Sequence, residues 1–372
     1  MGTGRWTTTT RIAAVAAFAI WVLTFAAARH MVREARAGSR PRAASRHRHE
    51  PAPSPQPKPA VVEPRAPRGH GVASSSGRAA AESEARIRAC EAAWSDWVLK
   101  RDGVELRDLT FRVVADEEFR ARTGAGWEKD VRARMARASA VFEREFRVRF
   151  VVASVGEWQS EDAAASIHDL HAALARRTGG GAEDVVIGFS SQHAPARAGA
   201  APDVYDRGVA YYFGRCCIVR AGTPPAGDPW PYEDETVLHE IGHVFGAWHS
   251  THGRSVMRAI KQGPENAGFD VYARAAVLSS RTVDFRRGTD AVDDATVATL
   301  FAAWKVSHPG DAEFPPWQAL CTEAWWARES GDADGAARRC DRALDMDRRL
   351  GPFERTADVR ELLTWAEARK RR

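Results

Sequence analysis

The chain has 372 residues, of which 44% are hydrophobic and 28% are charged, so it is long enough for two domains. Its five cysteines are too few for a scaffold built on disulfides. The net charge of +5 divides unevenly, because residues 1–80 carry 13 Lys or Arg and 3 Asp or Glu, a net +10, and the remainder is −5. Since the basic excess belongs to the N-terminal arm, the composition indicates no nucleic-acid partner for the body of the protein.

An apolar run near the N-terminus, Ile12–Ala28, follows two arginines. As a helix its 17 residues would span roughly 25 Å, slightly less than a bilayer core. Residues 1–28 are therefore predicted to be a cleaved signal peptide or an uncleaved signal anchor. The expected location is the cell envelope or the extracellular space, with the protein secreted or membrane-anchored through residues 12–28. The seven arginines from Arg29 to Arg48 oppose this topology under the positive-inside rule.

Residues 29–82 are rich in Arg, Ala and Pro and hold eight of the 19 prolines of the chain. They show no apolar periodicity, so they cannot bury a core. We expect an extended linker with polyproline II character. The alternative is that this basic arm binds an anionic lipid or a cell-wall polymer.

Residues 83–308 alternate between strand and helix patterns. The expected elements are a helix over 84–98, a strand over 109–114, a helix over 127–146, a strand over 148–155, a helix over 163–177, strands over 184–189 and 208–219, a helix over 235–245 and a helix over 290–304. This order predicts an α/β (α+β) domain with a mixed, mostly parallel, twisted sheet.

Residues 309–372 are predicted to be purely helical, with helices over 316–328, 333–348 and 356–371. Residues 331–347 resemble the second half of a tetratricopeptide repeat, but only about one repeat is present. Because stable arrays need about three repeats, we expect a helical appendage on the main domain. Cys321 and Cys340 lie at similar distances before and after the turn at Gly331, which makes them candidates for a disulfide in an exported protein.

The most informative stretch, residues 236–250, contains the pattern H-E-x-x-H-x-x-G-x-x-H. His239 and His243 are four residues apart, so a helix presents both imidazoles on one face, with Glu240 beside them. Gly246 allows the helix to end in a left-handed turn, which brings His249 round as a third ligand. Three protein ligands leave one tetrahedral position of a zinc ion open, as in catalytic sites.

Met257 follows His249 by eight residues. At this point the residues resemble the metzincin metalloproteases, whose extended histidine motif precedes a Met-turn beneath the zinc site. The spacing from His249 to Met257, and Ser250 after the third histidine, are most similar to the matrix metalloproteinase branch. Residues 258–260 are Arg-Ala-Ile where that branch has Pro-x-Tyr, so its pocket specificity is not carried over.

The resemblance implies a zinc-dependent endopeptidase with a polypeptide substrate. One catalytic Zn²⁺ would be held by the three histidines, and Glu240 would act as general base. Met257 would have a structural role, packing beneath the zinc site without binding the ion. The substrate would pair with the strand that begins at Gly208, and three aromatic residues, Tyr211, Tyr212 and Phe213, would line the cleft. The alternative is a catalytically silent, zinc-bearing module that binds peptides or proteins, with the C-terminal helices as its interaction surface. A calcium requirement and the oligomeric state stay open.

Several other histidines and cysteines have less specific patterns. His168 and His171 lie three apart on a predicted helix without further ligands, so we expect a solvated helix face. Cys216 and Cys217 are neighbours in a strand and should point to opposite faces of the sheet. Pairing of one of them with Cys90, or a role for Cys90 as a zinc switch, are the functional alternatives.

Overall fold

A computed structural model describes residues 75–161, 164, 166–178, 180–192, 207–221, 233–251, 254–259, 268–308, 311 and 314–371. By its internal contacts the chain divides into residues 1–69 and residues 70–372, and every described residue belongs to the second unit. The regions on both sides of position 308 therefore lie in one compact unit. The finer boundaries at 28, 82 and 308 stay predictions.

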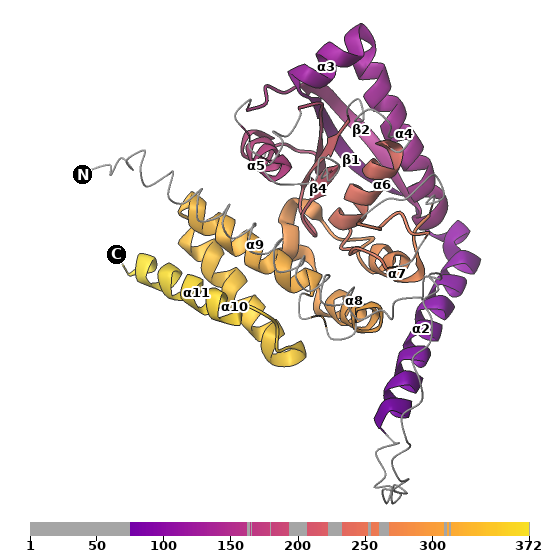
Figure 1. The fold of residues 1–372 in the computed structure, drawn as a ribbon, viewed down its shortest axis with the longest axis vertical. Coiled ribbons are helices and arrows are strands. Elements are labelled where there is room, and N and C mark those ends of the chain that lie inside the picture. The colour runs from indigo at the N-terminus through magenta and orange to yellow at the C-terminus, as the bar shows by residue number, and fades with distance from the viewer. Residues whose placement is uncertain are drawn as a thin grey trace, which may run out of the picture. The chain divides into compact units, whose positions relative to one another are not determined.

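The described strands form one sheet in the order β2-β1-β3-β5-β4 (Figure 1). The strands are β1 (Arg107–Ala115), β2 (Val148–Glu157), β3 (Val185–Ser190), β4 (Gly208–Ala210) and β5 (Cys216–Arg220). β1 runs parallel to β2 and β3, β3 runs parallel to β5, and β4 alone runs antiparallel to its neighbour. The predicted mixed, mostly parallel sheet is confirmed. In the described part of the chain β4 is an edge strand, paired on one side only.

The helices cover both faces of this sheet and continue beyond it (Figure 1). They are α2 (Ser75–Lys100), α3 (Glu117–Thr123), α4 (Trp127–Phe146), α5 (Ile167–Thr178), α6 (Glu233–Val244), α7 (Val271–Ser279), α8 (Asp294–Ser307), α9 (Pro315–Ser330), α10 (Ala333–Leu350) and α11 (Thr356–Lys370), with a 3₁₀ helix η3 (Phe285–Ala291) before α8. The bounds of α4 agree with the prediction to the residue. α3 and α7 were missed, because seven and nine residues are too few to show a clear helical period.

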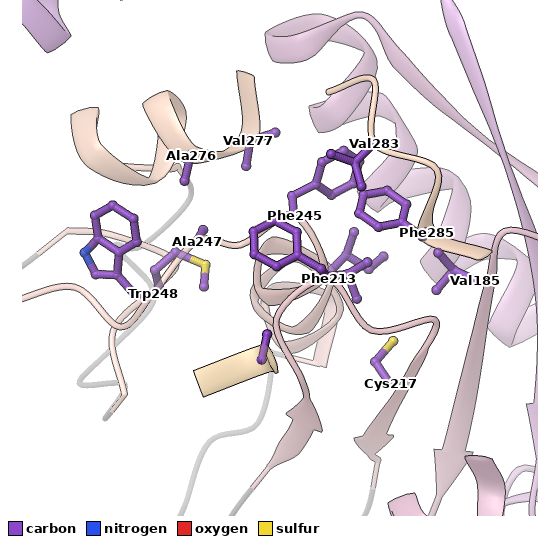
Figure 2. Packing of buried hydrophobic residues seen from close by; sticks show 14 of the residues in the cluster. Val185, Phe213, Cys217, Phe245, Ala247, Trp248, Ala276, Val277, Val283 and Phe285 are labelled. Atoms are coloured by element: carbon purple, nitrogen blue, oxygen red, sulfur yellow. The ribbon is translucent and has the colours of Figure 1, made fainter. Parts of the chain in front are cut away.

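The sheet buries apolar side chains on both faces, as mostly parallel sheets do. One face packs against α4 and α6 in a large core that includes Phe111 and Cys217. Figure 2 shows Cys217 and Val185 of the sheet among the buried side chains of this core, which also include Phe245. The other face packs against α5 through a smaller core, against which Cys216 lies. The two neighbouring cysteines therefore point to opposite faces, as predicted.

The C-terminal helices are tied to the segment before α8 by a charged network. Glu323 of α9 accepts hydrogen bonds from the backbone N (2.9 Å) and Oγ1 (2.6 Å) of Thr289, and from Nε of Arg339 in α10 (2.7 Å). The side chains of Glu323 and Arg339 are only 15% and 18% exposed. Gly288 makes room for the carboxylate, since a Cβ there would lie 2.5 Å from Oε1 of Glu323. The network joins η3, α9 and α10.

Replacing Glu323 with Ala is expected to lower the free energy of unfolding by about 2–3 kcal/mol. The reason is that Arg339 and Thr289 would stay shielded from water but would lose the carboxylate that accepts their hydrogen bonds. Urea unfolding of the variant measures this change. Glu329→Ala is the matched control, since Glu329 lies exposed on the same helix and should change stability by less than about 0.5 kcal/mol. Equal losses in the two variants would contradict the role of the network.

The predicted disulfide between Cys321 and Cys340 is not formed, and all five cysteines are free. α9 and α10 do pack together, but both thiols lie among apolar side chains, where they act as small hydrophobic groups. Burial raises the pKa of both thiols, which lowers their reactivity. Cys90 packs against the large core near Tyr272 of α7 and is a free thiol, so neither its pairing with Cys216 or Cys217 nor a zinc-switch role is supported.

The predicted transmembrane anchor, and the exported location based on it, are corrected. Within the residues that the structure describes, every helix is too short or too polar to cross a membrane. Residues 12–28, on which the expectation depended, lie outside those residues.

Candidate active site

The three histidines of the motif come together at the C-terminal end of α6. His239 and His243 project from the same face of the helix, one turn apart. The helix ends at Val244, and Gly246 has a φ of 78°, which turns the chain so that His249 joins them. A Cβ at Gly246 would overlap the ring of Phe213, so glycine is required there for packing as well as for its backbone conformation.

The ring nitrogens of the three histidines converge on one point. Nε2 of His243 lies 3.0 Å from Nε2 of His239 and 3.2 Å from Nε2 of His249. Nδ1 of His239 lies 2.8 Å from the carbonyl oxygen of Val256, and Nδ1 of His243 lies 2.7 Å from that of Ala247. A carbonyl can only accept, so both Nδ1 atoms carry the proton and both Nε2 atoms present a lone pair.

This arrangement fits a metal ion. Two lone pairs about 3 Å apart repel one another unless a cation lies between them. Nitrogens about 2.0–2.1 Å from a tetrahedral zinc ion would lie roughly 3.3–3.4 Å apart, close to the observed separations. Among the residues that the structure describes, these three histidines form a group that could hold a metal ion, because their ligand atoms all lie within 4.8 Å of one another. The triad is positioned to bind a metal.

The turn that contains Met257 supports the triad through its backbone. Ser250 donates its N–H to the carbonyl oxygen of Met257 (2.8 Å), and the preceding carbonyl, of Val256, accepts from His239. The side chain of Met257 is fully buried. A Cβ at Gly242 of α6 would lie 2.5 Å from its sulfur. The absence of a side chain at Gly242 therefore lets the turn approach the helix between the two histidines.

Gly242 was not singled out from the sequence. A signal was present, because glycine in the middle of a helix costs about 1 kcal/mol relative to alanine and calls for a packing reason. The packing reason is the sulfur of Met257, which lies in a different segment of the chain.

Glu240 belongs to α6, and its side chain lies between this helix and the edge strand β4. Its side chain is only 3% exposed. A Cβ at Gly208 would overlap its carboxylate, so the first residue of β4 must be glycine for Glu240 to keep this position. The structure thus places Gly208, one of the predicted cleft residues, directly beside Glu240.

The aromatic residues predicted to line the cleft separate onto different sides of β4. The ring of Tyr212 lies 5.4 Å from that of His243, on the side of α6. Tyr211 points to the opposite side, where its ring packs 4.8 Å from His171 of α5. This separation follows from the alternation of side chains along an extended chain.

Phe213 does not line the cleft, and the expectation that it does is wrong. Its side chain is 0% exposed and lies in the large core beneath Gly246 (Figure 2). The tight turn explains the difference, because Phe213 has a φ of 59° and so leaves the extended alternation that the sequence pattern suggested.

Residues 105–269 match the sequence model of metallo-peptidase family M12. No curated protein shows a significant match to the chain. Among solved structures, archaemetzincin from Methanopyrus kandleri is similar at 20% identity with a TM-score of 0.34, over 47% of this chain and 96% of that chain. A chaperone–substrate complex is similar at 14% identity with a TM-score of 0.31, over 55% of this chain and 35% of that chain.

The matched residues include the whole histidine motif, Glu240 and Met257. Residues 105–269 are therefore similar to the metallopeptidases of family M12, and they contain a histidine triad positioned to bind a metal. The match to the family model ends at residue 269, so α7 to α11 lie outside it. The tetratricopeptide likeness of the last helices stays a prediction.

The matched region also contains a buried histidine that was expected to be solvated. His171 of α5 is 1% exposed, and its Nε2 lies 2.9 Å from the carbonyl oxygen of Cys216. Its Nδ1 is buried without a hydrogen-bond partner. Burial lowers the pKa of His171 from 6.5 to about 4, so the imidazole is neutral in the folded protein.

The folded protein is expected to lose about 3 kcal/mol of stability through His171 as the pH falls from about 6.5 to about 4. The sign follows from the lowered pKa, because the unfolded chain binds the proton first and is favoured by it. Urea unfolding against pH, compared between the wild type and His171→Gln, isolates this contribution. The comparison is needed because burial raises the pKa of Asp116 to about 6, which changes stability with the opposite sign. Identical profiles would contradict the prediction.

Proposed function

We propose that the chain is an endopeptidase that uses one Zn²⁺, held by His239, His243 and His249, with Glu240 as the general base. The observation that carries this proposal is the convergence of the Nε2 atoms of the three histidines, with the carboxylate of Glu240 on the same helix as two of them. Three protein ligands leave one tetrahedral position for water or substrate, which favours a catalytic over a structural site.

The edge strand β4 is the proposed binding surface for an extended polypeptide. Its outer edge offers backbone groups for pairing, since the strand is bonded only to β5 in the described part of the chain. Gly208 at its start lies against Glu240, so a peptide along β4 would pass the carboxylate. Tyr212, with its ring against His243, lies on the same side.

In the proposed hydrolysis the zinc ion and Glu240 have different roles. A bound Zn²⁺ polarises the scissile carbonyl and lowers the pKa of water at the site. The carboxylate of Glu240 takes one proton from the attacking water, whose oxygen bonds to the carbonyl carbon. Glu240 then delivers that proton to the amide nitrogen as the C–N bond breaks, which leaves a carboxylic acid and an amine. The carboxylic acid then releases the second proton of the water to solvent. Because Glu240 is almost fully buried, its interactions with the reacting groups are little screened by solvent.

The test is cleavage of a peptide library by the zinc-loaded full chain, with new termini identified by mass spectrometry. We expect cleavage that stops when 1,10-phenanthroline removes the metal and returns when Zn²⁺ is restored. The silent binding module instead predicts peptides that are retained by the protein without any new termini. That result would overturn the proposal.

A further inference from the structure

Helix α9, which lies beyond the family match, reaches the end of the edge strand. The ring of Trp326 lies 5.0 Å from that of Tyr211 in an edge-to-face arrangement. The same ring is stacked on His171 of α5 at 6.3 Å. Tyr211 follows directly after β4, so a side chain from the C-terminal helices packs on the residue where this strand ends.

Tyr211 is joined to the histidine site by its neighbours in the chain. Its carbonyl oxygen accepts a hydrogen bond from the backbone N of Gly214 (2.9 Å), which closes the turn between β4 and β5. The next residue, Tyr212, places its ring 5.4 Å from His243. A displacement of Tyr211 would therefore move both the turn and the aromatic ring beside a predicted ligand.

The strand itself has little to hold it in place. β4 has three residues, Gly208 to Ala210, and pairs with β5 on one side. Strands of this length depend on side-chain packing, because a short ladder at a sheet edge opens easily. Val209 packs in the smaller core, and the contact of Trp326 with Tyr211 supplies packing at the next position on the same face.

We propose that Trp326 is a positioning residue for peptide binding. By packing on Tyr211 and His171, it fixes β4 and the adjoining turn in the place where an extended substrate pairs, and it holds Tyr212 beside His243. The role in peptide binding rests on the proposed peptidase function. The effect of Trp326 on the stability of β4 can be measured without any hydrolysis. It gives the C-terminal helices a part in substrate binding.

The test compares Trp326→Ala with Trp365→Ala in the zinc-loaded full chain. Trp365 is the matched control, because it is a half-buried tryptophan of α11 that lies against Arg328 of α9 and packs on the small cluster of buried alanines of the C-terminal helices. Hydrogen exchange of the backbone amides of residues 208–212 is the first measurement. We expect exchange at least about tenfold faster in Trp326→Ala than in the wild type, and unchanged exchange in Trp365→Ala.

Peptide cleavage is the second measurement. Trp326→Ala should raise KM about tenfold with kcat within about threefold, since the ligands and Glu240 are untouched. Trp326→Phe keeps an aromatic ring on Tyr211 and should restore both exchange and KM to within about threefold. This variant also covers the case in which the alanine variant fails to fold.

The outcomes separate the two proposals. Equal exchange at residues 208–212 in the wild type and Trp326→Ala, or equal acceleration in Trp365→Ala, would overturn the positioning role. A wild-type protein that cleaves no peptide would overturn the proposed peptidase function, while the exchange data would still decide whether Trp326 orders β4.

Discussion

Glu240→Gln is expected to reduce kcat for peptide cleavage by about 10²–10⁴-fold while the zinc content stays at the wild-type level. The glutamine side chain has the same shape, so it fits beside Gly208, but its amide cannot take a proton from water. Steady-state kinetics on a peptide identified by the library measure the loss, and metal analysis measures the zinc.

The control for Glu240 lies on the same helix. Asp234 forms an ion pair with Arg137 near the start of α6, at the surface, and Asp234→Asn should keep activity within about twofold. If Glu240→Gln kept kcat within about threefold of the wild type, Glu240 would not be the general base. Loss of zinc together with activity would instead indicate that the carboxylate supports the metal site.

His243→Ala is expected to abolish both stoichiometric zinc binding and peptide cleavage. His243 is the central histidine of the triad, because its Nε2 lies within 3.2 Å of the Nε2 atoms of both His239 and His249. The two remaining histidines would hold zinc far more weakly than three. After dialysis against a chelator and addition of an equimolar amount of Zn²⁺, the variant should retain little metal where the wild type holds about one ion per chain.

Thermal unfolding adds a readout for His243 that needs no substrate. An ion that binds only the folded state stabilises it by about 2.7 kcal/mol at one hundred times its Kd, so Zn²⁺ should raise the Tm of the wild type and not that of His243→Ala. His168→Ala is the control, since His168 lies on α5 outside the triad and the variant should keep the zinc-dependent shift. Unchanged zinc content in His243→Ala would refute its assignment as a ligand.

Local patterns predicted much of the fold. The period of apolar residues in 127–146 gave α4 with the correct first and last residues, because a long amphipathic helix shows its buried face several times over. The strands were found as short apolar runs, and their mostly parallel pairing followed from the helices between them. The short helix α7 was missed, since buried residues such as Tyr272 and Val277 repeat over too few turns.

The errors share one cause, which is that a side chain's surroundings depend on segments far away in the sequence. Phe213 was expected in the cleft, but its turn directs it into the core beneath Gly246. His171 was expected in solvent, but β5 and α9 cover its face of α5. Cys321 and Cys340 were expected to form a bond, but they pack among apolar side chains as free thiols.

The sequence alone determined the chemistry of the candidate site. The spacing of His239, Glu240 and His243 fixes their common helix face, because 3.6 residues per turn places positions four apart on one side. Gly246 sets the end of that helix by its backbone freedom, which brings in His249. These relations lie within about ten residues, so local geometry is sufficient to define them.

Only the tertiary structure decided which residues from distant parts of the sequence pack around this site. It placed Gly208 against Glu240, Gly242 against Met257, and Trp326 against Tyr211. Each of these contacts joins two segments that only the complete fold brings together. Because the side chains are closely packed, each contact depends on the size of both residues. Such contacts leave no local period in the sequence, and for that reason the contact between α9 and the end of the edge strand became visible only in three dimensions.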